Sequence, residues 1–393
     1  MREIVASTIW MSPGTRPERT PPGERESGSG PPLEPGDTPA ADACSGARPP
    51  ALGLAKVPPA MPDKRALIIG IAGQDGSYLA ELLLDEGYEV FGVVRQPASA
   101  PFDNLAAVRD DLELLQADVL DELSLVDVLS GCRPSEVYNL ASPSFVPMSW
   151  RQPVLTAEFA AVGCTALLEA IRRVDAGIRF YQASSSEIFG EPREVPQTED
   201  TPLHPVTPYG VAKAYAHFIT LSYRRRYGLH ASSGILYNHE SPRRPPDFVT
   251  RKVARAAAAI SLGLESEVAL GDLDARRDWG YAGDYVRAMW LMLQQPEPGD
   301  YVIATGESHS VRELAAGAFA HVGLDWEEHV RVDDSLLRGK AELHDLVGDS
   351  SKARAGLGWS PTIDFEQLVR LLVDTDVERL RARLEPAESL VDG

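Results

Sequence analysis

The amino-acid sequence predicts an α/β fold with a doubly wound parallel sheet and a smaller C-terminal lobe. Three observations predict it. Apolar runs of strand length alternate with helical patterns from about residue 65, a glycine-rich turn joins the first run to the first helix, and the alternation becomes irregular after Asn238. Parallel strands need crossover helices, so the alternation favours a sheet that helices cover on both faces.

The elements of the predicted sheet follow one another closely. The first strand is RALIIGI, a helix follows from about Ser77 to Glu86, and the later strands are YEVFGVV, LELLQA, EVYNLA, IRFYQAS and ASSGILYN. Beyond Asn238 we expect an alanine-rich helix from about Arg251 to Leu264, short strands, and a late helix from about Asp364 to Leu380. These less regular elements are typical of a substrate-binding lobe.

The first helix follows a glycine pattern that is typical of dinucleotide sites. Gly70, Gly73 and Gly76 lie three residues apart between the first strand and the amphipathic helix. Glycines at these positions permit a tight turn and let backbone N–H groups approach a pyrophosphate. The turn, with its Gln74 and Asp75, therefore predicts the dinucleotide-binding site of a Rossmann-type domain.

Two further residues bear on the choice of cofactor. The second strand ends in Arg95, with no carboxylate at that point to bind a ribose 2′-hydroxyl. An arginine suits a 2′-phosphate, so the sequence favours NADP over NAD. Asp118, after the third strand, is expected either to accept a hydrogen bond from the adenine amino group or to cap the next helix.

These patterns define three segments. Residues 1–60 are rich in Pro, Gly, Ser and Ala and are expected to form a disordered extension, with Met61 resembling the natural start of a protein. Residues 61–237 are the predicted NADP-binding Rossmann domain. Residues 238–385 are mainly the predicted substrate-binding lobe, with some segments returning to the Rossmann domain. The alternative for the extension is a regulatory tail or targeting peptide, although its acidic residues argue against a transit peptide.

The composition restricts the class of protein. The 393 residues carry a net charge of -20, which argues against binding nucleic acid or an anionic membrane. Neither the three cysteines nor the eight histidines follow a metal-binding or disulfide pattern, so we expect no metal and reduced thiols. Without a signal peptide or an apolar run near the ~20 residues that span a bilayer, a cytoplasmic protein is expected.

A catalytic group is predicted around Tyr209 and Lys213. They lie four residues apart, so a helix places both on one face, and the ammonium is expected to lower the pKa of the phenol toward neutrality. Ser185 and Glu187 follow the fifth strand, at the edge of the sheet where ligands bind. Ser185 can hydrogen-bond the sugar oxygen that Tyr209 deprotonates, and Glu187 can act as acid and base.

Nine segments between about Lys64 and Val377 carry a resemblance to a known family. They are GIAGQDGSYLAELLL, EVYNLA, FYQASSSEIFGEP, TPYGVAKAYA, GILYNHESPRR, FVTRKV, GDLDARRDWGYAGDYVRAMWLMLQQ, YVIATG and GDSSKARAGLGW. Through these segments the chain resembles the GDP-mannose 4,6-dehydratase family of extended short-chain dehydrogenases. NHESPRR and RDWG are far more specific than the glycine turn, because membership of the superfamily alone does not require them.

The resemblance implies a lyase that converts GDP-D-mannose to GDP-4-dehydro-6-deoxy-D-mannose and water, with internal hydride transfer through NADP. In that reaction Tyr209, with Lys213 and Ser185, removes the O4 proton. Glu187 moves the C5 proton to the departing C6 hydroxyl. Tyr209 and Lys213 are also expected to contact the cofactor.

By the same resemblance, a set of polar residues is expected around the nucleotide sugar. Arg338 and Glu342 resemble a late family contact in which one fewer residue separates the pair. The expected substrate-binding residues are Asn238, Arg243, Arg244, Lys252, Arg277, Arg338 and Glu342. A homodimer is also implied, through helices at Val154 to Ile171 and Tyr209 to Tyr223.

Three departures from the family keep alternatives open. The segment Ser142 to Val146 replaces polar residues near the sugar, Arg95 to Ala98 lacks the paired arginines and serines that help join dimers into a tetramer, and Ser185 replaces threonine. The competing functions are a UDP-glucuronate decarboxylase, a dehydratase of another nucleotide sugar, and a non-catalytic NADP-binding sensor.

Overall fold

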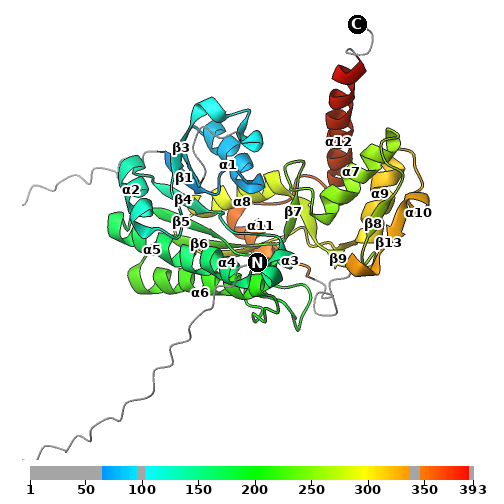
Figure 1. Cartoon of the computed structure of the whole chain (residues 1–393). Helices are drawn as coiled ribbons and strands as arrows, with labels where there is room; N and C mark the ends of the chain where they lie inside the picture. Colours follow the sequence, from blue (N-terminus) through cyan, green and yellow to red (C-terminus); the bar gives the residue numbers. More distant parts are fainter. Residues whose placement is uncertain (1–63, 96–101, 337–345, 389–393) are drawn as a thin grey trace, which may run out of the picture. The chain divides into compact units, whose positions relative to one another are not determined.

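The computed structural model describes residues 64–95, 102–336 and 346–388, and all of these belong to one unit, Pro59–Gly393 (Figure 1). The predicted extension over residues 1–60 lies outside the described residues, and so does most of the loop that begins at Arg95.

A seven-stranded parallel sheet forms the centre of this unit. Its order is β11-β6-β5-β4-β1-β2-β3, and every pair of neighbours is parallel. The strands are β1 (Arg65–Ile69), β2 (Glu89–Val94), β3 (Leu112–Gln116), β4 (Glu136–Asn139), β5 (Arg179–Ala183), β6 (Ala231–Leu236) and β11 (Asp300–Ile303). The strand order changes direction between β1 and β4, which is where ligands bind in such sheets. The predicted fold class is confirmed.

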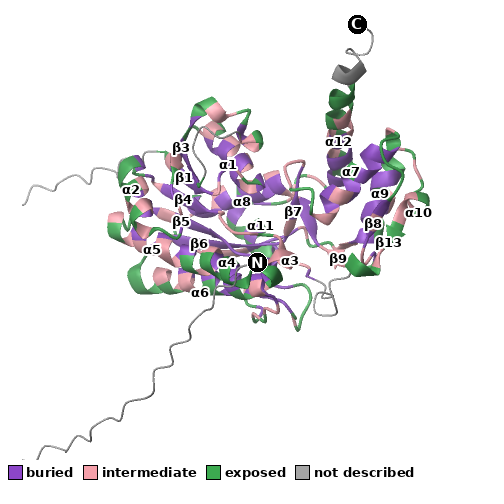
Figure 2. Ribbon diagram, in the orientation of Figure 1, coloured by how far each residue is buried: buried purple, intermediate pink, exposed green. Residues whose placement is uncertain are grey.

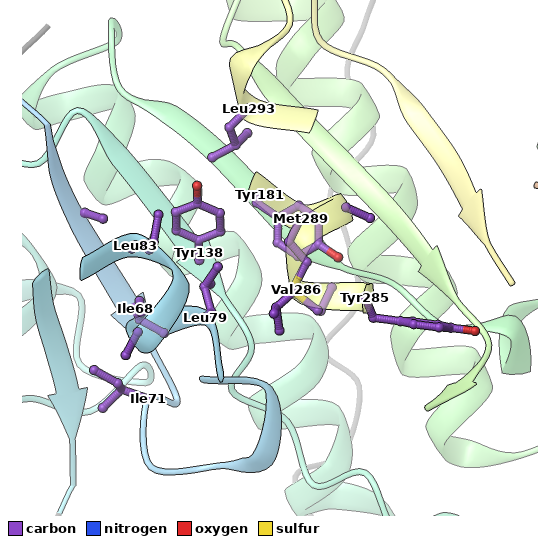
Figure 3. Packing of buried hydrophobic residues seen from close by; sticks show 14 of the residues in the cluster. Ile68, Ile71, Leu79, Leu83, Tyr138, Tyr181, Tyr285, Val286, Met289 and Leu293 are labelled. Atoms are coloured by element: carbon purple, nitrogen blue, oxygen red, sulfur yellow. The ribbon is translucent and has the colours of Figure 1, made fainter. Parts of the chain in front are cut away.

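Helices cover both faces of the sheet, which explains why β1 is apolar and buried from Ala66 to Ile69. The helices of one face are α1 (Gln74–Asp85), α8 (Ala282–Gln294) and α11 (Ser351–Leu357), and Figure 3 shows part of the core that they form with the sheet. Those of the other face are α2 (Glu122–Cys132), α5 (Gly163–Val174) and α6 (Pro208–Tyr227). In Figure 2 the buried strands lie between helices whose outer sides are exposed.

The C-terminal lobe has its own core, which includes Val253, Leu314, Phe319, Trp279 and Leu372. Its helices are α7 (Val249–Ser261), α9 (Val311–His321), α10 (Trp326–His329) and α12 (Phe365–Glu388). Its strands form three short pairs: β7 (Asn238–Glu240) with β10 (Trp279–Tyr281), β9 (Arg276–Arg277) with β12 (His309–Ser310), and β8 (Val268–Leu270) with β13 (Val330–Val332).

Several elements differ from their predicted bounds. Helix α1 starts three residues earlier than predicted, since Gly73 serves as its N-cap, and α12 continues to Glu388. Strand β11 was absent from the predicted set, because only four residues of it pair with β6. Although β11, α8 and α11 lie beyond residue 237 in the chain, they pack on the large sheet. The domain boundary at that residue stays a prediction.

The helical stretch Pro153–Val174 is long and apolar enough to span a membrane by length and composition alone. It comprises α4 (Pro153–Ala157), a π-helical turn η3 (Glu158–Val162) and α5. About half of its most apolar window, 56%, is buried, and residues such as Leu167 and Ile171 belong to the core beneath the sheet. A core helix of a soluble protein passes the same test.

A buried ion pair fixes α12 to α7. The carboxylate of Asp376 accepts two hydrogen bonds from Arg251, at 2.5 and 2.6 Å, and both side chains are buried. Asp376→Ala is therefore expected to lower the free energy of unfolding by about 3–5 kcal/mol, because it leaves a buried guanidinium unpaired. Asp374→Ala is the matched control: this carboxylate pairs with His321 but is 61% exposed, so its loss should cost less than about 1 kcal/mol. Unfolding by denaturant measures the free energy of unfolding of both variants. An equal decrease in the two would contradict this prediction.

Candidate active site

The glycine turn lies at the carboxyl end of β1, where the strand order changes direction. Gly70 has a φ of +88°, and a Cβ on it would lie 3.1 Å from the backbone nitrogen of Ala141. A Cβ on Gly76 would lie 2.4 Å from the carbonyl oxygen of Gly70. Only glycine fits at both positions, and the turn is correspondingly tight.

The first turn of α1 presents its backbone amides, since no side chain caps it at Gly73. The side chains of this turn are used elsewhere. Gln74 donates to the backbone oxygen of His239 at 3.1 Å, and Asp75 accepts from the His239 ring at 2.9 Å. Any contact that Gln74 and Asp75 make with a dinucleotide pyrophosphate is therefore expected from their backbone.

Arg95 and Asp118 lie at the ends of β2 and β3. The exposed guanidinium of Arg95 lies 4.7 Å from the centroid of the Phe159 ring in η3. Asp118 accepts from its own neighbour, the backbone nitrogen of Leu120, at 3.0 Å. The cap of α2 is Asp121, whose carboxylate accepts from the first backbone amides of the helix. Of the two predicted roles of Asp118, helix capping is thus wrong, and contact with adenine stays a prediction.

The four predicted catalytic residues come from two elements. Ser185 and Glu187 lie at the short helix η4 (Ser186–Ile188) that follows β5, and Tyr209 and Lys213 lie in the first turns of α6. Thr207 caps α6 by accepting from the backbone nitrogen of Gly210 at 3.0 Å. A Cβ on Gly210 would lie 2.5 Å from the carbonyl oxygen of Glu187, so α6 and η4 are in close backbone contact.

A chain of hydrogen bonds links three of these groups. The backbone nitrogen of Glu187 donates to Ser185 Oγ at 3.3 Å, and the Ser185 hydroxyl is hydrogen-bonded to the Tyr209 phenol. Lys213 donates to the carbonyl oxygen of Ala183 at 2.9 Å, and its Nζ lies 5.6 Å from the centroid of the Tyr209 ring. Tyr209, Lys213 and Ser185 are buried, and Glu187 is half-buried. The structure thus brings all four together.

The electrostatics of this group differ from the prediction. Burial raises the pKa of Tyr209, although the hydrogen bond from Ser185 and the charge of Arg244 act to lower it. Burial also lowers the pKa of Lys213 to about 8. The predicted lowering of the tyrosine pKa by Lys213 is therefore wrong for the protein without ligands, because the cost of burying a phenolate is the larger effect.

Two of the predicted substrate-binding residues lie on or close to the pair of short strands β7 and β10. Asn238 begins β7 and pairs with Trp279 of β10, and Arg277 lies two residues before Trp279. Lys252 of α7 donates to the carbonyl oxygen of Ala269 at 2.6 Å. The pairing of β7 with β10 brings the NHE and RDWG segments, far apart in sequence, to one place.

The paired arginines of the NHESPRR segment have different partners. Arg243 donates to Ser77 at 3.1 Å and pairs with Glu81 at 2.6 Å, so it binds α1. Arg244 stacks over Phe248 at 3.7 Å and lies 3.3 Å from Glu240. Arg244 is close enough to Tyr209 for its charge to act to lower the pKa of the phenol. Arg338 and Glu342 lie outside the described residues.

Two structural contributors were not predicted. Asp278, fully buried, accepts from the backbone nitrogens of Thr305 and Gly306 at 3.0 and 2.9 Å and thereby fixes the strand of Arg277. The sequence feature that could have indicated Asp278 is its position within the RDWG segment. Ser184 is buried beside Ser185, and its hydroxyl has no hydrogen-bond partner among the described residues.

The departure at Phe145 has a visible consequence. Its ring packs edge-to-face on Phe248, with 5.4 Å between centroids. Arg244 in turn lies over the ring of Phe248. The nearby Ser142 hydroxyl is buried without a partner among the described residues. An aromatic pair thus takes the place of the family's polar side chains after β4.

Comparison with known proteins gives consistent matches. The family model described as GDP-mannose 4,6 dehydratase matches residues 67–372. GDP-mannose 4,6 dehydratase 1 of Arabidopsis thaliana is 48% identical over 329 residues, 81% of this chain and 91% of the relative. The human GDP-mannose 4,6 dehydratase is 45% identical over 347 residues, with 81% and 93% covered.

A solved structure shows the same fold. The dTDP-glucose 4,6-dehydratase of Streptomyces venezuelae, solved with NAD bound, superposes with a TM-score of 0.72 at 25% identity and covers 82% of this chain and 99% of its own.

Proposed function

The chain belongs to the GDP-mannose 4,6-dehydratase family, and from that premise we propose that it removes water from GDP-D-mannose to give GDP-4-dehydro-6-deoxy-D-mannose. It is a nucleotide-sugar 4,6-dehydratase, a hydro-lyase. The observation that carries the proposal is the meeting of Ser185, Glu187, Tyr209 and Lys213 at the edge of the sheet beside the glycine turn. A cytoplasmic location is part of the same proposal.

The site fits a nicotinamide dinucleotide. The tight turn at Gly70 and Gly76 and the uncapped start of α1 suit such a ligand. The buried hydroxyl of Ser184, which has no partner among the described residues, is free to bond one. When bound, the dinucleotide supplies a two-electron acceptor and donor that is regenerated in each cycle. The residues of this chain supply the proton transfers.

Tyr209 is the base for the hydroxyl at C4 of the sugar. Its phenol is hydrogen-bonded to Ser185, which donates and so stabilises the phenolate. Lys213 and Arg244 add positive charge near Tyr209. The proton of the C4 hydroxyl passes to Tyr209 as the carbon is oxidised.

Glu187 serves the elimination. A carbonyl group at C4 makes the neighbouring C5 proton acidic, and a carboxylate is then strong enough to remove it. The same carboxyl group returns the proton to the C6 hydroxyl, which leaves as water. The C5=C6 double bond that remains would be saturated by the stored hydride at C6 and by a proton at C5, which balances the proton that Tyr209 takes from the C4 hydroxyl. Its half-buried position, one residue beyond the buried Ser186, leaves it accessible to a sugar.

Mass spectrometry tests the proposal directly. The protein is incubated separately with GDP-mannose, CDP-glucose and UDP-glucuronate. Loss of one water from GDP-mannose alone is the expected result. Loss of carbon dioxide from UDP-glucuronate would instead indicate a UDP-glucuronate decarboxylase. If none of the three nucleotide sugars reacted, the result would favour a non-catalytic NADP-binding sensor.

NADP is the dinucleotide that we propose, because Arg95 directly follows β2, at a point where a carboxylate would select NAD. Arg95→Glu is expected to weaken NADPH binding by about tenfold or more while NADH binding changes less, since the 2′-phosphate loses its cationic partner. Arg226→Glu is the matched control, because this exposed arginine also lies over an aromatic ring, Tyr227, at 6.0 Å. Equal loss for both dinucleotides in calorimetric titrations would contradict the choice of NADP.

A homodimer is proposed through an exposed apolar surface on neighbouring helices. On α6 the surface consists of Val211, Tyr215 and Phe218, which are 55%, 47% and 53% exposed and share one helical face. The adjoining stretch adds Val154 and Val162, at 69% and 57%. A continuous apolar surface of this kind marks an interface.

Phe218→Glu is expected to convert the dimer to a monomer, because it places a charge in the apolar surface. Leu123→Glu is the control, since Leu123 is 76% exposed on α2, a helix outside this surface. Light scattering after size-exclusion chromatography measures the mass. A monomeric wild type, or a dimeric Phe218 variant, would rule this interface out.

A further inference from the structure

A buried hydrogen-bond network joins the start of α1 to β7. Asp75 accepts from His239 Nε2 at 2.9 Å, and Gln74 donates to the backbone oxygen of His239 at 3.1 Å and accepts from Ser241 at 2.8 Å. Gln74, His239 and Ser241 are buried. Since α1 carries the glycine turn and β7 begins with Asn238, the network connects the two halves of the site.

The partners of His239 determine its charge. Its Nδ1 lies 2.7 Å from the backbone oxygen of Tyr237, and its Nε2 faces the carboxylate of Asp75. Both partners only accept hydrogen bonds, so both ring nitrogens carry hydrogen and the ring is an imidazolium. Burial opposes the charged form of each group, but their attraction raises the pKa of His239 and lowers that of Asp75 to about 2.

Other elements hold the ring in place. Tyr285 stacks on it with 4.6 Å between centroids and 20° between planes, and Figure 3 shows this side chain projecting from α8. The charged and titratable groups that face His239 are Asp75 from α1, Tyr285 from α8 and Arg244 from the loop after β7; Arg244 is itself paired with Glu240. The ring is therefore fixed in both position and charge.

This charge matters because of where Asp75 lies. The first turn of α1 attracts anions through its backbone amides, and a pyrophosphate uses those same amides. An unneutralised carboxylate in that turn would repel the phosphates. His239 provides the compensating charge from the opposite side of Asp75, within the protein.

We infer that His239 is a positioning residue for the dinucleotide, which neutralises Asp75 beneath the phosphate-binding turn and ties that turn to the strand of Asn238. The inference rests on the proposed function only in that the chain binds a nicotinamide dinucleotide. It does not depend on the sugar.

Calorimetric titration with NADPH tests the charge. His239→Gln keeps a hydrogen-bond donor but removes the charge, and the dissociation constant is expected to rise about tenfold, equivalent to about 1.4 kcal/mol. Adding Asp75→Asn removes the uncompensated carboxylate, so the double variant should recover most of the lost affinity. His230→Gln is the matched control, since this histidine bonds the backbone oxygen of Gln295 at the sheet edge and should bind as the wild type does.

If His239 had a purely structural role, the double variant would bind NADPH no better than His239→Gln. That result, or a dissociation constant of His239→Gln equal to that of the wild type, overturns the inference. Thermal unfolding of each variant verifies that it is folded.

A second measurement applies even if His239→Gln does not fold. In the wild type the Asp75 carboxylate raises the pKa of His239 against the effect of burial, which lowers it. In Asp75→Asn the carboxylate is gone, so the pKa of His239 falls and the ring loses its charge as the pH rises. Burial and the charge of Arg244 then hold the pKa of His239 below its ordinary value of about 6.5. Relative to the wild type, the NADPH dissociation constant of this variant should therefore rise at lower pH, between about pH 5 and pH 7. A pH dependence identical to the wild type overturns the inference.

These results are separable from the proposed function. A wild type that fails to dehydrate GDP-mannose would overturn the proposed function without altering the measured NADPH constants. Conversely, equal constants for the wild type, His239→Gln and the double variant would overturn the inference while dehydration of GDP-mannose continued.

Discussion

Replacing Glu187 by Gln is expected to lower the rate of water loss from GDP-mannose by about 10²–10⁴-fold, the contribution typical of a positioned acid and base. The amide has nearly the same shape but cannot take the C5 proton or return it to the C6 hydroxyl. The backbone contacts of this residue, from its nitrogen to Ser185 and from its carbonyl oxygen against Gly210, do not depend on the side chain. The variant should therefore fold and bind NADPH normally.

Deuterium exchange identifies the step that fails. In D₂O the wild type is expected to form product that carries solvent deuterium, whereas the Glu187 variant should show neither product nor exchange at C5 of recovered substrate. Glu191→Gln is the matched control, since Glu191 lies four residues further along and is exposed. Normal turnover by the Glu187 variant would assign the elimination to another group.

Replacing Tyr209 by Phe should have an effect of similar size, about 10²–10⁴-fold on kcat, because the sugar O4 proton loses its acceptor. The ring of Tyr209 is buried at the start of α6, so phenylalanine fills the same space. Tyr227→Phe, at the exposed end of the same helix, is the control.

The pH profile gives an independent measure of the same residue. Burial raises the pKa of Tyr209, so the phenolate form becomes more populated as the pH rises, and kcat/KM of the wild type should rise with it. In the Tyr209→Phe variant this rise should disappear from the residual activity. A variant that retains the wild-type profile would exclude Tyr209 as the base.

The fold was largely predictable because the strands of a covered parallel sheet are continuous apolar runs. Six strands were found from such runs, and the helix at Tyr209 from its spacing. Strand β11 was missed since it contributes only the four residues Asp300–Ile303 at the sheet edge. The start of α1 was placed too late because Gly73 serves as the N-cap without a capping side chain.

The site was predictable where residues are close in sequence and not where they are distant. Tyr209 and Lys213 share a helix, and Ser185 and Glu187 share a turn, so spacing located them. The contact between Asp75 and His239 spans 164 positions, and no local pattern indicates it. The pKa of Tyr209 was mispredicted because burial, which a motif does not reveal, outweighs the neighbouring charges.

The sequence separation of Asp75 and His239 also has a consequence for folding on the ribosome. The glycine turn is synthesised early, but its partner strand emerges 164 residues later, and the pair Arg251 and Asp376 adds a contact across a further 125 positions. Contacts of such long range form slowly and after local ones. A nascent chain that ends before β7 is therefore expected to have most of the sheet but only weak affinity for NADPH, so that the dinucleotide is retained only once the lobe has been made.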